Sequence, residues 1–385
     1  MKRTPEVMLL IESARAYERA LLRGIAQYSH LHGPWIIFRE PPFWEKRPQQ
    51  ALLAQLRAVD GIIMRECSYM SQIRQLHKPV IVSNYATPQF DGLSNFWSDN
   101  VEIGRMAADH LLERGFRNLA FCGYDHLFWS NQRWDGFRRR VEEGGYRVHR
   151  YEPSRTRKQL LWKQEQQHVT KWLQSLPKPV GLMACVDERS QQVAEACKAA
   201  AITVPDQVAI VGVDNDETIC TLVNIRLSSV AIDAEKAGYE AAALLHTMMR
   251  RGGTSQQRIE IKPTHVVTRT STDVVAVDDP HVATAVKYIR DNCRQELYVR
   301  DIARAAGVSR RCLETRFRAT LARSINHQVR YSRIQMIMNM LIETTMTISE
   351  IAFSMGFPDA AHIARYFKSE TNLSLAEFRR RHRPQ

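Results

Sequence analysis

The sequence predicts an α/β domain built on two doubly wound sheets, followed by a smaller all-α domain that carries two helix-turn-helix motifs. Three observations lead to this fold class. From residue 5 to about 275, short β-rich runs alternate with amphipathic helical stretches; after that point only helical periodicity remains; and the helical part contains an internal repeat. We therefore expect one domain over residues 1–275 and another over 276–385, with its motifs at about 299–320 and 347–370.

The first part contains short runs that are apolar on both faces, as in strands of parallel sheets covered by helices. These runs are VMLLI, IIFRE, GIIM, PVIVSNYA, LAFCGY, GLMACV and VAIVGV. Helical stretches lie between them, at residues 16–30, 101–115, 133–145, 188–201 and 234–251. Roughly a dozen such elements are enough for two doubly wound sheets, which bind ligands beyond the carboxyl ends of their strands.

The chain is strongly basic, and the basic residues are unevenly distributed. Of 385 residues, 44% are hydrophobic and 25% are charged, which is ordinary for a globular protein, but the net charge is +13. From Asp279 onward there are 18 Lys and Arg against 10 Asp and Glu, whereas the preceding residues hold 36 against 31. A small basic part beside a near-neutral larger one indicates contact with a polyanion, although a solubilising basic tail would have the same composition.

Cysteine usage and hydropathy predict where the protein acts. The seven cysteines, at 67, 122, 185, 197, 220, 293 and 312, are scattered and include no C-x-x-C, so neither a disulfide framework nor a zinc site is expected. The N-terminal apolar run ends at Glu12, which is too short for a signal peptide, and no later run approaches the ~20 apolar residues of a membrane span. We expect a cytoplasmic protein with buried thiols and no membrane partner.

The repeat in the helical part predicts two helix-turn-helix motifs. IARAAGVSRRCLETRF (302–317) aligns with IAFSMGFPDAAHIARYF (351–367), which has one extra residue in its turn. The aligned pairs are Ile302/Ile351, Ala303/Ala352, Gly307/Gly356, Leu313/Ile363 and Phe317/Phe367. Each copy is predicted to form a short helix, a glycine turn and a second helix. The periodicity of residues 325–345 predicts a long connecting helix. The pair Thr347 and Glu350 predicts a capping box, and the Asp-Asp-Pro at 278–280 predicts the start of a helix.

The second helix of such a motif lies in the major groove, and its outward residues near the N-terminal end face base edges. Small side chains allow close approach, alanine can contact a thymine methyl, and Arg or His can donate to guanine or phosphate. The exposed candidates are Ser309 (as N-cap), Arg310, Arg311, Glu314, Thr315 and Arg318 in the first copy, and Asp359, Ala360, Ala361, His362 and Arg365 in the second. A helical bundle with a solvated face is the alternative, but two copies in a basic domain favour double-stranded DNA.

Roughly the last 105 residues resemble the DNA-binding domain of the AraC/XylS family of transcription regulators, whose two helix-turn-helix motifs are joined by a long helix. The segment IAFSMGFPDAAHIARYFK carries the most specific similarity. By position, the resemblance implies base-reading residues at Arg311, Glu314, Thr315, Ala360, Ala361, His362 and Arg365. Glu314 and the two alanines depart from the amide or basic side chains often found there.

Five segments of the larger domain resemble the effector domain of LacI/GalR regulators, a periplasmic-binding-protein-like fold with a ligand cleft between two lobes. They are IESARAYERALLRGI, SDNVEIGRMAADHLLERG, QRWDGFRRRVEEGGY, ACVDERSQQVAEAC and VPDQVAIVGVDNDE. The domain order, together with RLSSVAIDAEKAGYEAAALLH, is most similar to that of the xylose operon regulators. The resemblance implies a homodimeric activator of a sugar-utilisation operon. Its partners would be an operator in double-stranded DNA, RNA polymerase and a small sugar effector, a pentose and D-xylose in particular.

A sugar cleft needs charged hydrogen-bonding groups for the hydroxyls and an apolar plate for the ring. By family position Arg133, in R-x-x-G-F, is the expected donor and Asp187, after GLMACV, the expected acceptor. Asp214 and Asn215 follow VAIVGV in the same way, although Asp214 could equally hold the hinge between lobes. The other candidates are Ser13, Arg15 and Glu18 in the first βα turn and the aromatic residues Tyr17, Phe128, Trp129 and Trp134, which could equally serve packing.

An enzyme is the main alternative, because doubly wound sheets host many activities. No dinucleotide-binding, P-loop, H-E-x-x-H or G-x-S-x-G motif occurs, so we expect neither a cofactor nor catalytic residues. Paired acids such as Asp214 and Asp216 could perform acid–base work, yet binding hydroxyls needs the same groups. A sugar-modifying enzyme fused to a DNA-binding domain therefore stays open as the second hypothesis.

Overall fold

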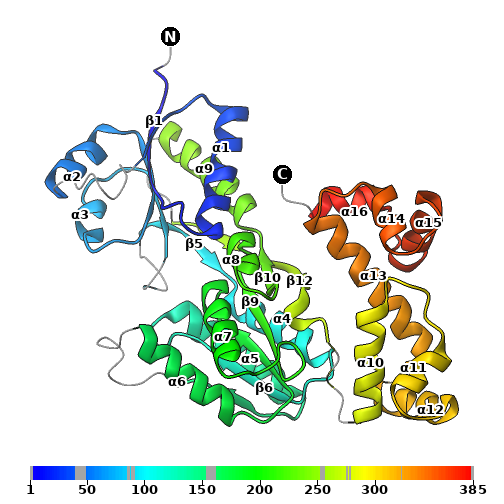
Figure 1. Cartoon of the computed structure of the whole chain (residues 1–385). Helices are drawn as coiled ribbons and strands as arrows, with labels where there is room; N and C mark the ends of the chain where they lie inside the picture. The colour runs from blue at the N-terminus through cyan, green and yellow to red at the C-terminus, as the bar shows by residue number, and fades with distance from the viewer. Residues whose placement is uncertain are drawn as a thin grey trace. The chain divides into compact units, whose positions relative to one another are not determined.

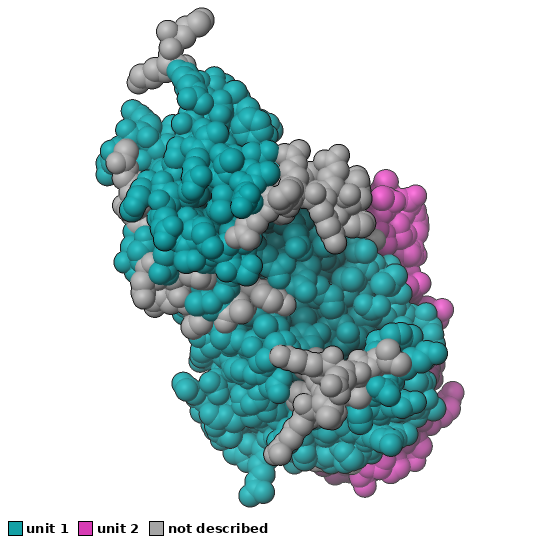
Figure 2. Space-filling view, turned by 90° about the vertical axis from the view of Figure 1, so that its left-hand side faces the viewer, with its two compact units in different colours: residues 1–111, 117–267 teal, residues 112–116, 268–385 magenta. Residues whose placement is uncertain are grey.

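The computed structural model describes residues 3–39, 49–84, 87, 92–152, 162–251, 256–274, 276, 279–321 and 323–382. The chain forms two compact units, coloured separately in Figure 2. Unit 1 comprises Met1–Leu111 and Arg117–Val267, and unit 2 comprises Leu112–Phe116 and Thr268–Gln385. The change of unit at Thr268 precedes the domain boundary that we predicted near residue 276. Within the described ranges, no helix is both long and apolar enough to cross a membrane.

Unit 1 has two lobes, each built on its own sheet (Figure 1). The first sheet has the strand order β11-β5-β4-β3-β1-β2 and all its pairings are parallel. Its strands are β1 (Glu6–Leu10), β2 (Ile36–Arg39), β3 (Gly61–Arg65), β4 (Val80–Ser83), β5 (Ser94–Ser98) and β11 (Arg258–Ile261). The helices of this lobe are α1 (Ala16–His32), α2 (Gln49–Ala58), α3 (Met70–Arg74) and α9 (Ala234–Arg251). Since the sheet is covered by helices, the central strands are buried along almost their whole length.

The second sheet has the order β12-β10-β9-β8-β6-β7, and only the β10–β12 pairing is antiparallel. Its strands are β6 (Asn118–Cys122), β7 (Val148–Arg150), β8 (Val180–Ala184), β9 (Val208–Val213), β10 (Ser228–Ile232) and β12 (Pro263–Val267). Its helices are α4 (Asn100–Leu112), α5 (Phe128–Glu143), α6 (Trp162–Ser175), α7 (Asp187–Ala199) and α8 (Glu217–Leu222). The predicted class, a two-lobed α/β fold followed by a helical region, is confirmed.

The chain passes between the two lobes after β5, after β10 and after β11. The three crossings are tied to one another by backbone hydrogen bonds, from the Asp99 N–H to the Ile261 carbonyl (3.0 Å) and from the Asp233 N–H to the Lys262 carbonyl (2.9 Å). These hydrogen bonds hold the three connections between the lobes next to one another.

One strand departs from the sequence-based expectation. IIFRE was predicted as a strand buried on both faces, but β2 lies at the edge of its sheet and all four of its residues are exposed. Ile36, Ile37 and Phe38 are 39–45% exposed. An edge strand pairs on one side only, so apolar composition alone cannot distinguish it from a central strand.

Unit 2 contains a short 3₁₀ turn, η2 (Thr270–Thr272), and seven helices in the described residues. They are α10 (Pro280–Asn292), α11 (Val299–Ala305), α12 (Arg310–Leu321), α13 (Ile325–Glu343), α14 (Ile348–Ser354), α15 (Ala360–Thr371) and α16 (Leu375–His382). The predicted capping box is present, since Thr347 and Glu350 exchange side chain to backbone hydrogen bonds. Asp279 caps α10 ahead of Pro280, at the predicted start; Asp278 lies outside the described residues.

The internal repeat predicted from the sequence is confirmed by burial. The apolar residues of each aligned pair, from Ile302/Ile351 to Phe317/Phe367, are at most 3% exposed. The glycine pair occupies the left-handed region in both turns, with φ of +70° at Gly307 and +71° at Gly356. Each turn also closes with an equivalent backbone bond, Val308 N–H to Ala303 and Phe357 N–H to Ala352.

The long helix α13 joins the two helix-turn-helix motifs. Its first part packs with α10, α11 and α12 through Ile325, and its second part packs with α14, α15 and α16 through Ile337 and Leu341. The two apolar clusters of unit 2 therefore share one continuous helix, as Figure 1 shows along the orange helix.

Candidate functional site

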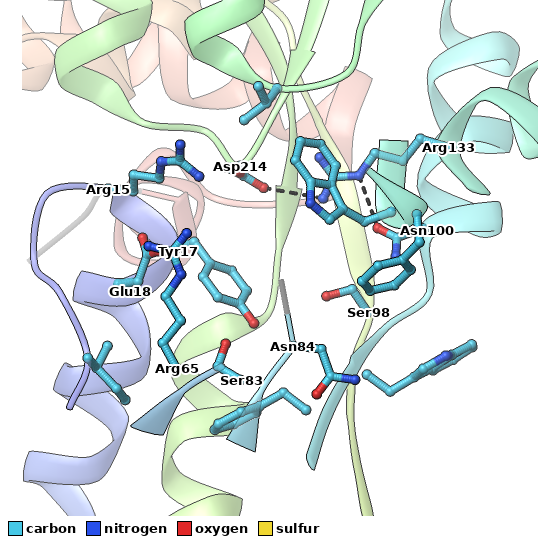
Figure 3. A pocket seen from close by; sticks show the side chains of 16 residues that line it. Arg15, Tyr17, Glu18, Arg65, Ser83, Asn84, Ser98, Asn100, Arg133 and Asp214 are labelled. Atoms are coloured by element: carbon cyan, nitrogen blue, oxygen red, sulfur yellow. Dashed lines mark hydrogen bonds and ion pairs between the residues drawn. The ribbon is translucent and has the colours of Figure 1, made fainter. Parts of the chain in front are cut away.

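A cavity lies between the two lobes of unit 1, at the carboxyl ends of their strands. Its volume is about 80 Å³, several times the space that one buried water needs. The first lobe contributes Ile11, Arg15, Tyr17, Glu18, Arg65, Ser83, Asn84, Phe96, Trp97 and Ser98, and the second contributes Asn100, Phe128, Trp129, Arg133, Val186 and Asp214. Figure 3 shows how the labelled polar side chains converge from several different elements. This is the location at which doubly wound sheets bind ligands.

Arg133, near the start of α5, is held in place on every side. Its Nε donates to Asn100 Oδ1 at 3.0 Å, one terminal nitrogen donates to the Cys185 carbonyl, and the other lies 3.7 Å from Asp214 Oδ1. The guanidinium also lies 5.0 Å from the centroid of the Trp129 ring. Arg133 is only 6% exposed, so this cation is desolvated and oriented before any ligand arrives.

Two carboxylates of the cavity have oxygen atoms without hydrogen bonds. Oδ1 of Asp214 and Oε2 of Glu18 are buried, and neither accepts a hydrogen bond from any residue that the structure describes. Burial raises the pKa of both carboxyl groups. The backbone of Asp214 is in the left-handed region, with a φ of +95°. An unsatisfied buried acceptor costs about 1–3 kcal/mol, which a ligand hydroxyl would relieve. The two oxygens thus mark positions for hydroxyl donors.

The opposite wall carries a tyrosine and further cations. Burial in this wall raises the pKa of Tyr17 to about 12, so its hydroxyl stays protonated at neutral pH and hydrogen-bonds with Ser83. Arg15 forms an ion pair with Glu188 of the second lobe at 3.1 Å, and Arg65 pairs with Glu12 at 3.3 Å. Figure 3 shows Arg15, Glu18 and Arg65 on one side of the cavity and Arg133 with Asn100 on the other.

Six of the nine ligand-binding residues predicted from the sequence line this cavity, namely Arg15, Tyr17, Glu18, Trp129, Arg133 and Asp214. Ser13, Asp187 and Asn215 are not among its lining residues. Ser13 is exposed to solvent, and the Asn215 N–H donates to Ser229 Oγ at 3.0 Å.

Asp187, the acceptor expected from the family resemblance, is not among the residues that line this cavity. Its side chain is completely buried, and its two carboxylate oxygens accept hydrogen bonds from the Asp216 N–H and from Ser229 Oγ, both at 2.7 Å. It therefore holds the loop after β9 in place behind the cavity, and it does not present an acceptor to a ligand there. The two donors come from the start of α8, at Asp216, and from β10, at Ser229, which meet only in the folded lobe.

Only some of the aromatic candidates line the cavity. Phe128 and Trp129 line the cavity with Tyr17, whereas Trp134 packs beside Phe121 and under the guanidinium of Arg150. The sequence-based prediction missed several cavity residues that end a strand or begin a helix: Arg65, Ser83, Asn84, Phe96, Trp97, Ser98 and Asn100. A signal was available for Arg65, Ser83 and Asn84, which follow or end the apolar runs GIIM and PVIV. The strand β5, which carries Phe96, Trp97 and Ser98, was not among the predicted strands.

The second candidate site is the outward face of α12 and α15 in unit 2. Arg310, Arg311, Thr315 and Arg318 are exposed on α12, and Glu314 is half-buried and pairs with Arg310 at 2.9 Å. Ser309 accepts a hydrogen bond from the Cys312 N–H, as expected of an N-cap. On α15, Ala361, His362 and Arg365 are exposed and Ala360 is half-buried.

Asp359, one of the residues predicted to face DNA, lies at the start of α15. It is the N-cap of α15, and its carboxylate accepts from the His362 N–H at 2.8 Å and lies 2.9 Å from His362 Nδ1. The hydrogen bonds to His362 lower the pKa of Asp359. Asp359 thus stabilises the helix start and orients the imidazole, leaving His362 and Arg365 as the polar side chains available to bases.

Known proteins and family models match both parts of the chain. A family model described as a periplasmic binding protein-like domain matches residues 108–272, and one described as a helix-turn-helix domain matches residues 302–381. The xylose operon regulatory protein of Haemophilus influenzae is 32% identical over 383 residues, covering 97% of this chain and 98% of that protein. Its Escherichia coli K12 counterpart is 29% identical over 384 residues, covering 97% and 96%. A solved structure of the xylose-binding transcription activator XylR covers 100% of both chains, with 28% identity and a TM-score of 0.71.

These features define a DNA-binding transcription regulator in which a two-lobed sensor precedes an AraC-type pair of helix-turn-helix motifs. Its relatives are regulators rather than enzymes. The chain belongs to the family of the xylose operon regulatory proteins.

Proposed function

We propose that this chain is a cytoplasmic activator of a sugar-utilisation operon and that it binds a pentose, D-xylose in particular, in the cavity of unit 1. The observation that carries the proposal is the convergence of one oriented cation, Arg133, and two carboxylates with an oxygen that accepts no hydrogen bond in the described residues, Asp214 and Glu18, on the cavity between the lobes. A sugar offers hydroxyls that both donate and accept, so it satisfies all three groups at once. The names of the relatives support xylose as the first sugar to test.

The proposed mechanism is a shift between open and closed lobes. Arg15 and Glu18 belong to the first lobe, whereas Arg133 and Asp214 belong to the second, so a sugar that contacts both sides favours the closed arrangement. The ligand can shift the equilibrium only by its difference in affinity for the two states. The proposal includes a sensor domain over residues 1–275 and a DNA-binding domain over 276–385.

Calorimetric titration of the full chain with D-xylose, L-arabinose, D-ribose and D-glucose tests the effector. We expect D-xylose to bind most tightly, and Asp214→Asn to weaken it by about 1–3 kcal/mol because a charge-assisted hydrogen bond is lost. Glu217→Gln is the matched control, since Glu217 is an exposed carboxylate three residues further on. A chain that binds none of these sugars would contradict the proposed sensor role, as would turnover of any of them detected by chromatography.

We also propose that two copies associate through the sensor domain and that the dimer contacts RNA polymerase beside its operator. The family resemblance supports both, and the exposed apolar edge strand β2, with Leu31 nearby at 65% exposed, supports association. Light scattering after gel filtration should give twice the chain mass. A monomer at working concentration would exclude the dimer.

Base reading is proposed for Arg311, Glu314 and Thr315 on α12 and for Ala360, Ala361, His362 and Arg365 on α15. The support is their place near the N-terminal end of each second helix, with side chains that point away from the apolar clusters. Two such helices can enter successive major grooves about 34 Å apart.

A further inference from the structure

A second cavity lies within unit 2, and nothing in the proposed function uses it. Its volume is about 180 Å³, and its polar lining comes from α10, α13 and the segments around Arg114 and Asp273. Every lining residue belongs to the same compact unit. It is therefore a feature of this unit itself.

Two polar atoms of this cavity are buried without hydrogen bonds. They are Nε of Arg323, a donor, and Oε1 of Gln328, an acceptor, and neither has a partner in the described part of the chain. Gln328 is only 2% exposed, and its amide nitrogen donates to Ser332 Oγ at 3.3 Å. The Arg323 guanidinium lies 5.4 Å from the centroid of the Tyr331 ring. A ligand that satisfies both atoms must accept from Arg323 and donate to Gln328.

The charge of the lining favours an anion. Three guanidinium groups, from Arg114, Arg290 and Arg323, line the cavity with two carboxyl groups, from Glu113 and Asp273, and Arg290 also forms an ion pair with Asp291 at 3.4 Å. Arg114 Nε donates to the Thr272 carbonyl at 2.9 Å, and a terminal nitrogen of Arg290 donates to the Asp273 carbonyl at 3.1 Å. These bonds to neutral backbone carbonyls hold the two cations in place.

The pKa shifts of two lining residues, Arg323 and Asp273, also favour an anion. Burial, together with the charge of Arg114, lowers the pKa of Arg323, and burial raises the pKa of Asp273. The charge of Arg114 contributes to the lowered pKa of Arg323, and a bound anion would offset that contribution.

We propose that this cavity binds a small oxyanion that also carries a hydroxyl hydrogen, such as hydrogen phosphate or a sugar phosphate whose sugar supplies the hydroxyl. The oxyanion oxygens accept from Arg323, Arg114 and Arg290, and the hydroxyl donates to Gln328 Oε1. Sulfate has the same shape and a similar charge, but it carries no hydroxyl hydrogen at neutral pH. Phosphate should therefore bind more tightly than sulfate.

The location gives such binding a consequence. Gln328 and Tyr331 lie on α13, the helix shared by both apolar clusters, and Arg290 lies on α10, which packs against the start of α13. An anion that bridges α10 and α13 stabilises the scaffold on which both helix-turn-helix motifs depend. The site would thus make the stability of unit 2 respond to a phosphorylated metabolite or to free phosphate.

The test uses the full chain with inorganic phosphate, sulfate, chloride and ribose 5-phosphate at constant ionic strength, followed by calorimetry and thermal unfolding. We expect saturable binding of phosphate at one site per chain, weaker binding of sulfate and none of chloride. Tighter binding of ribose 5-phosphate than of inorganic phosphate would assign the site to a metabolite, and the reverse order would assign it to the free ion. Absence of saturable phosphate binding, or equal affinities for phosphate and sulfate, would overturn the proposal.

Two variants locate the binding. Arg323→Gln should weaken phosphate about tenfold or more, as loss of a charge-assisted hydrogen bond implies, and Gln328→Met should abolish the preference over sulfate. Arg318→Gln is the control, because it removes one charge from the exposed face of α12. If Arg318→Gln weakens phosphate as much as Arg323→Gln does, the anion binds the DNA-facing surface and the assignment to the cavity is wrong. The comparison of phosphate with sulfate on the unmodified chain needs no variant, so the test survives if one fails to fold.

Discussion

The carboxylate of Asp216 accepts a hydrogen bond from the backbone N–H of Ala16, with 2.9 Å between Oδ2 and the nitrogen, and so ties the two lobes of unit 1 together. The same oxygen accepts from Arg19 at 2.9 Å, and the other oxygen caps α8 by accepting from Thr218 at 3.1 Å. The buried carboxylate of Asp187 positions the backbone of Asp216 from behind. A polar contact between the lobes therefore lies directly beside the cavity.

Asp216→Asn should weaken effector binding by about 1–2 kcal/mol, since a neutral oxygen accepts from Arg19 and Ala16 less strongly than a carboxylate does. Asparagine is as good an N-cap as aspartate, so α8 and the overall stability should change little. Calorimetry measures the affinity, and urea unfolding measures the stability. Unchanged sugar affinity in a folded Asp216→Asn chain would show that this contact does not favour the closed lobes.

Asp214→Asn should stabilise the sugar-free chain at neutral pH. Burial raises the pKa of Asp214, so the folded chain holds this proton to higher pH than the unfolded chain does. The contribution of this group to stability is therefore present below the unfolded pKa and is lost as the pH rises through the folded one. The melting temperature of the variant should exceed that of the parent at pH 7, and the difference should disappear in the acid range. A lower melting temperature at pH 7 would mean that the charged form of Asp214 stabilises the fold, contrary to this expectation.

Replacement of His362 or Arg365 by alanine should cost about 1–3 kcal/mol of operator binding and relax sequence preference at one groove. Both side chains are exposed on α15 and away from its buried residues Ile363 and Phe367. Lys368→Ala, which removes an exposed cation from the last turn of the same helix, serves as the control. Mobility-shift titrations against operator variants give the numbers. If neither variant alters binding or preference, α15 does not lie in the groove.

Alanine at the two turn glycines should destabilise unit 2 to different extents. Both Gly307 and Gly356 have φ near +70°, where a side chain costs about 1–2 kcal/mol. A Cβ at Gly307 would meet open space, whereas at Gly356 it would lie 3.2 Å from the Arg294 carbonyl. Gly356→Ala should therefore be the more destabilising in urea unfolding, with Gly307→Ala as its matched comparison. Equal losses in the free energy of unfolding would mean that the Arg294 carbonyl can move away from the new Cβ without a cost in stability.

The features that the sequence predicted best are those determined by local chemistry. Gly307 and Gly356 occupy turns that need a left-handed residue, Thr347 and Glu350 lie three apart at a helix start, and Asp279 precedes a proline. Each depends on neighbours within a few residues, so the pattern alone determines the outcome.

The cavity was predicted less completely, because its geometry depends on contacts between distant segments. Asp187 and Asp214 both follow apolar strands, but only the folded lobe brings Ser229 and the Asp216 backbone to Asp187 and leaves an oxygen of Asp214 facing the cavity. The return of β11 to the first sheet, where it pairs with β5 across more than a hundred residues, has no local signal either. Strand-end position predicts the edge of the sheet and cannot choose among the side chains there.

The shared helix α13 determines the distance between the two helix-turn-helix motifs. Because one continuous rod contributes buried side chains to both apolar clusters of unit 2, the two motifs cannot slide or twist independently without exposing one of those clusters to water. If both motifs read DNA as proposed, a single base pair inserted between their two subsites must be absorbed by bending or overwinding of the duplex and not by the protein. The number of base pairs between the two subsites would then determine binding as much as their base sequences do.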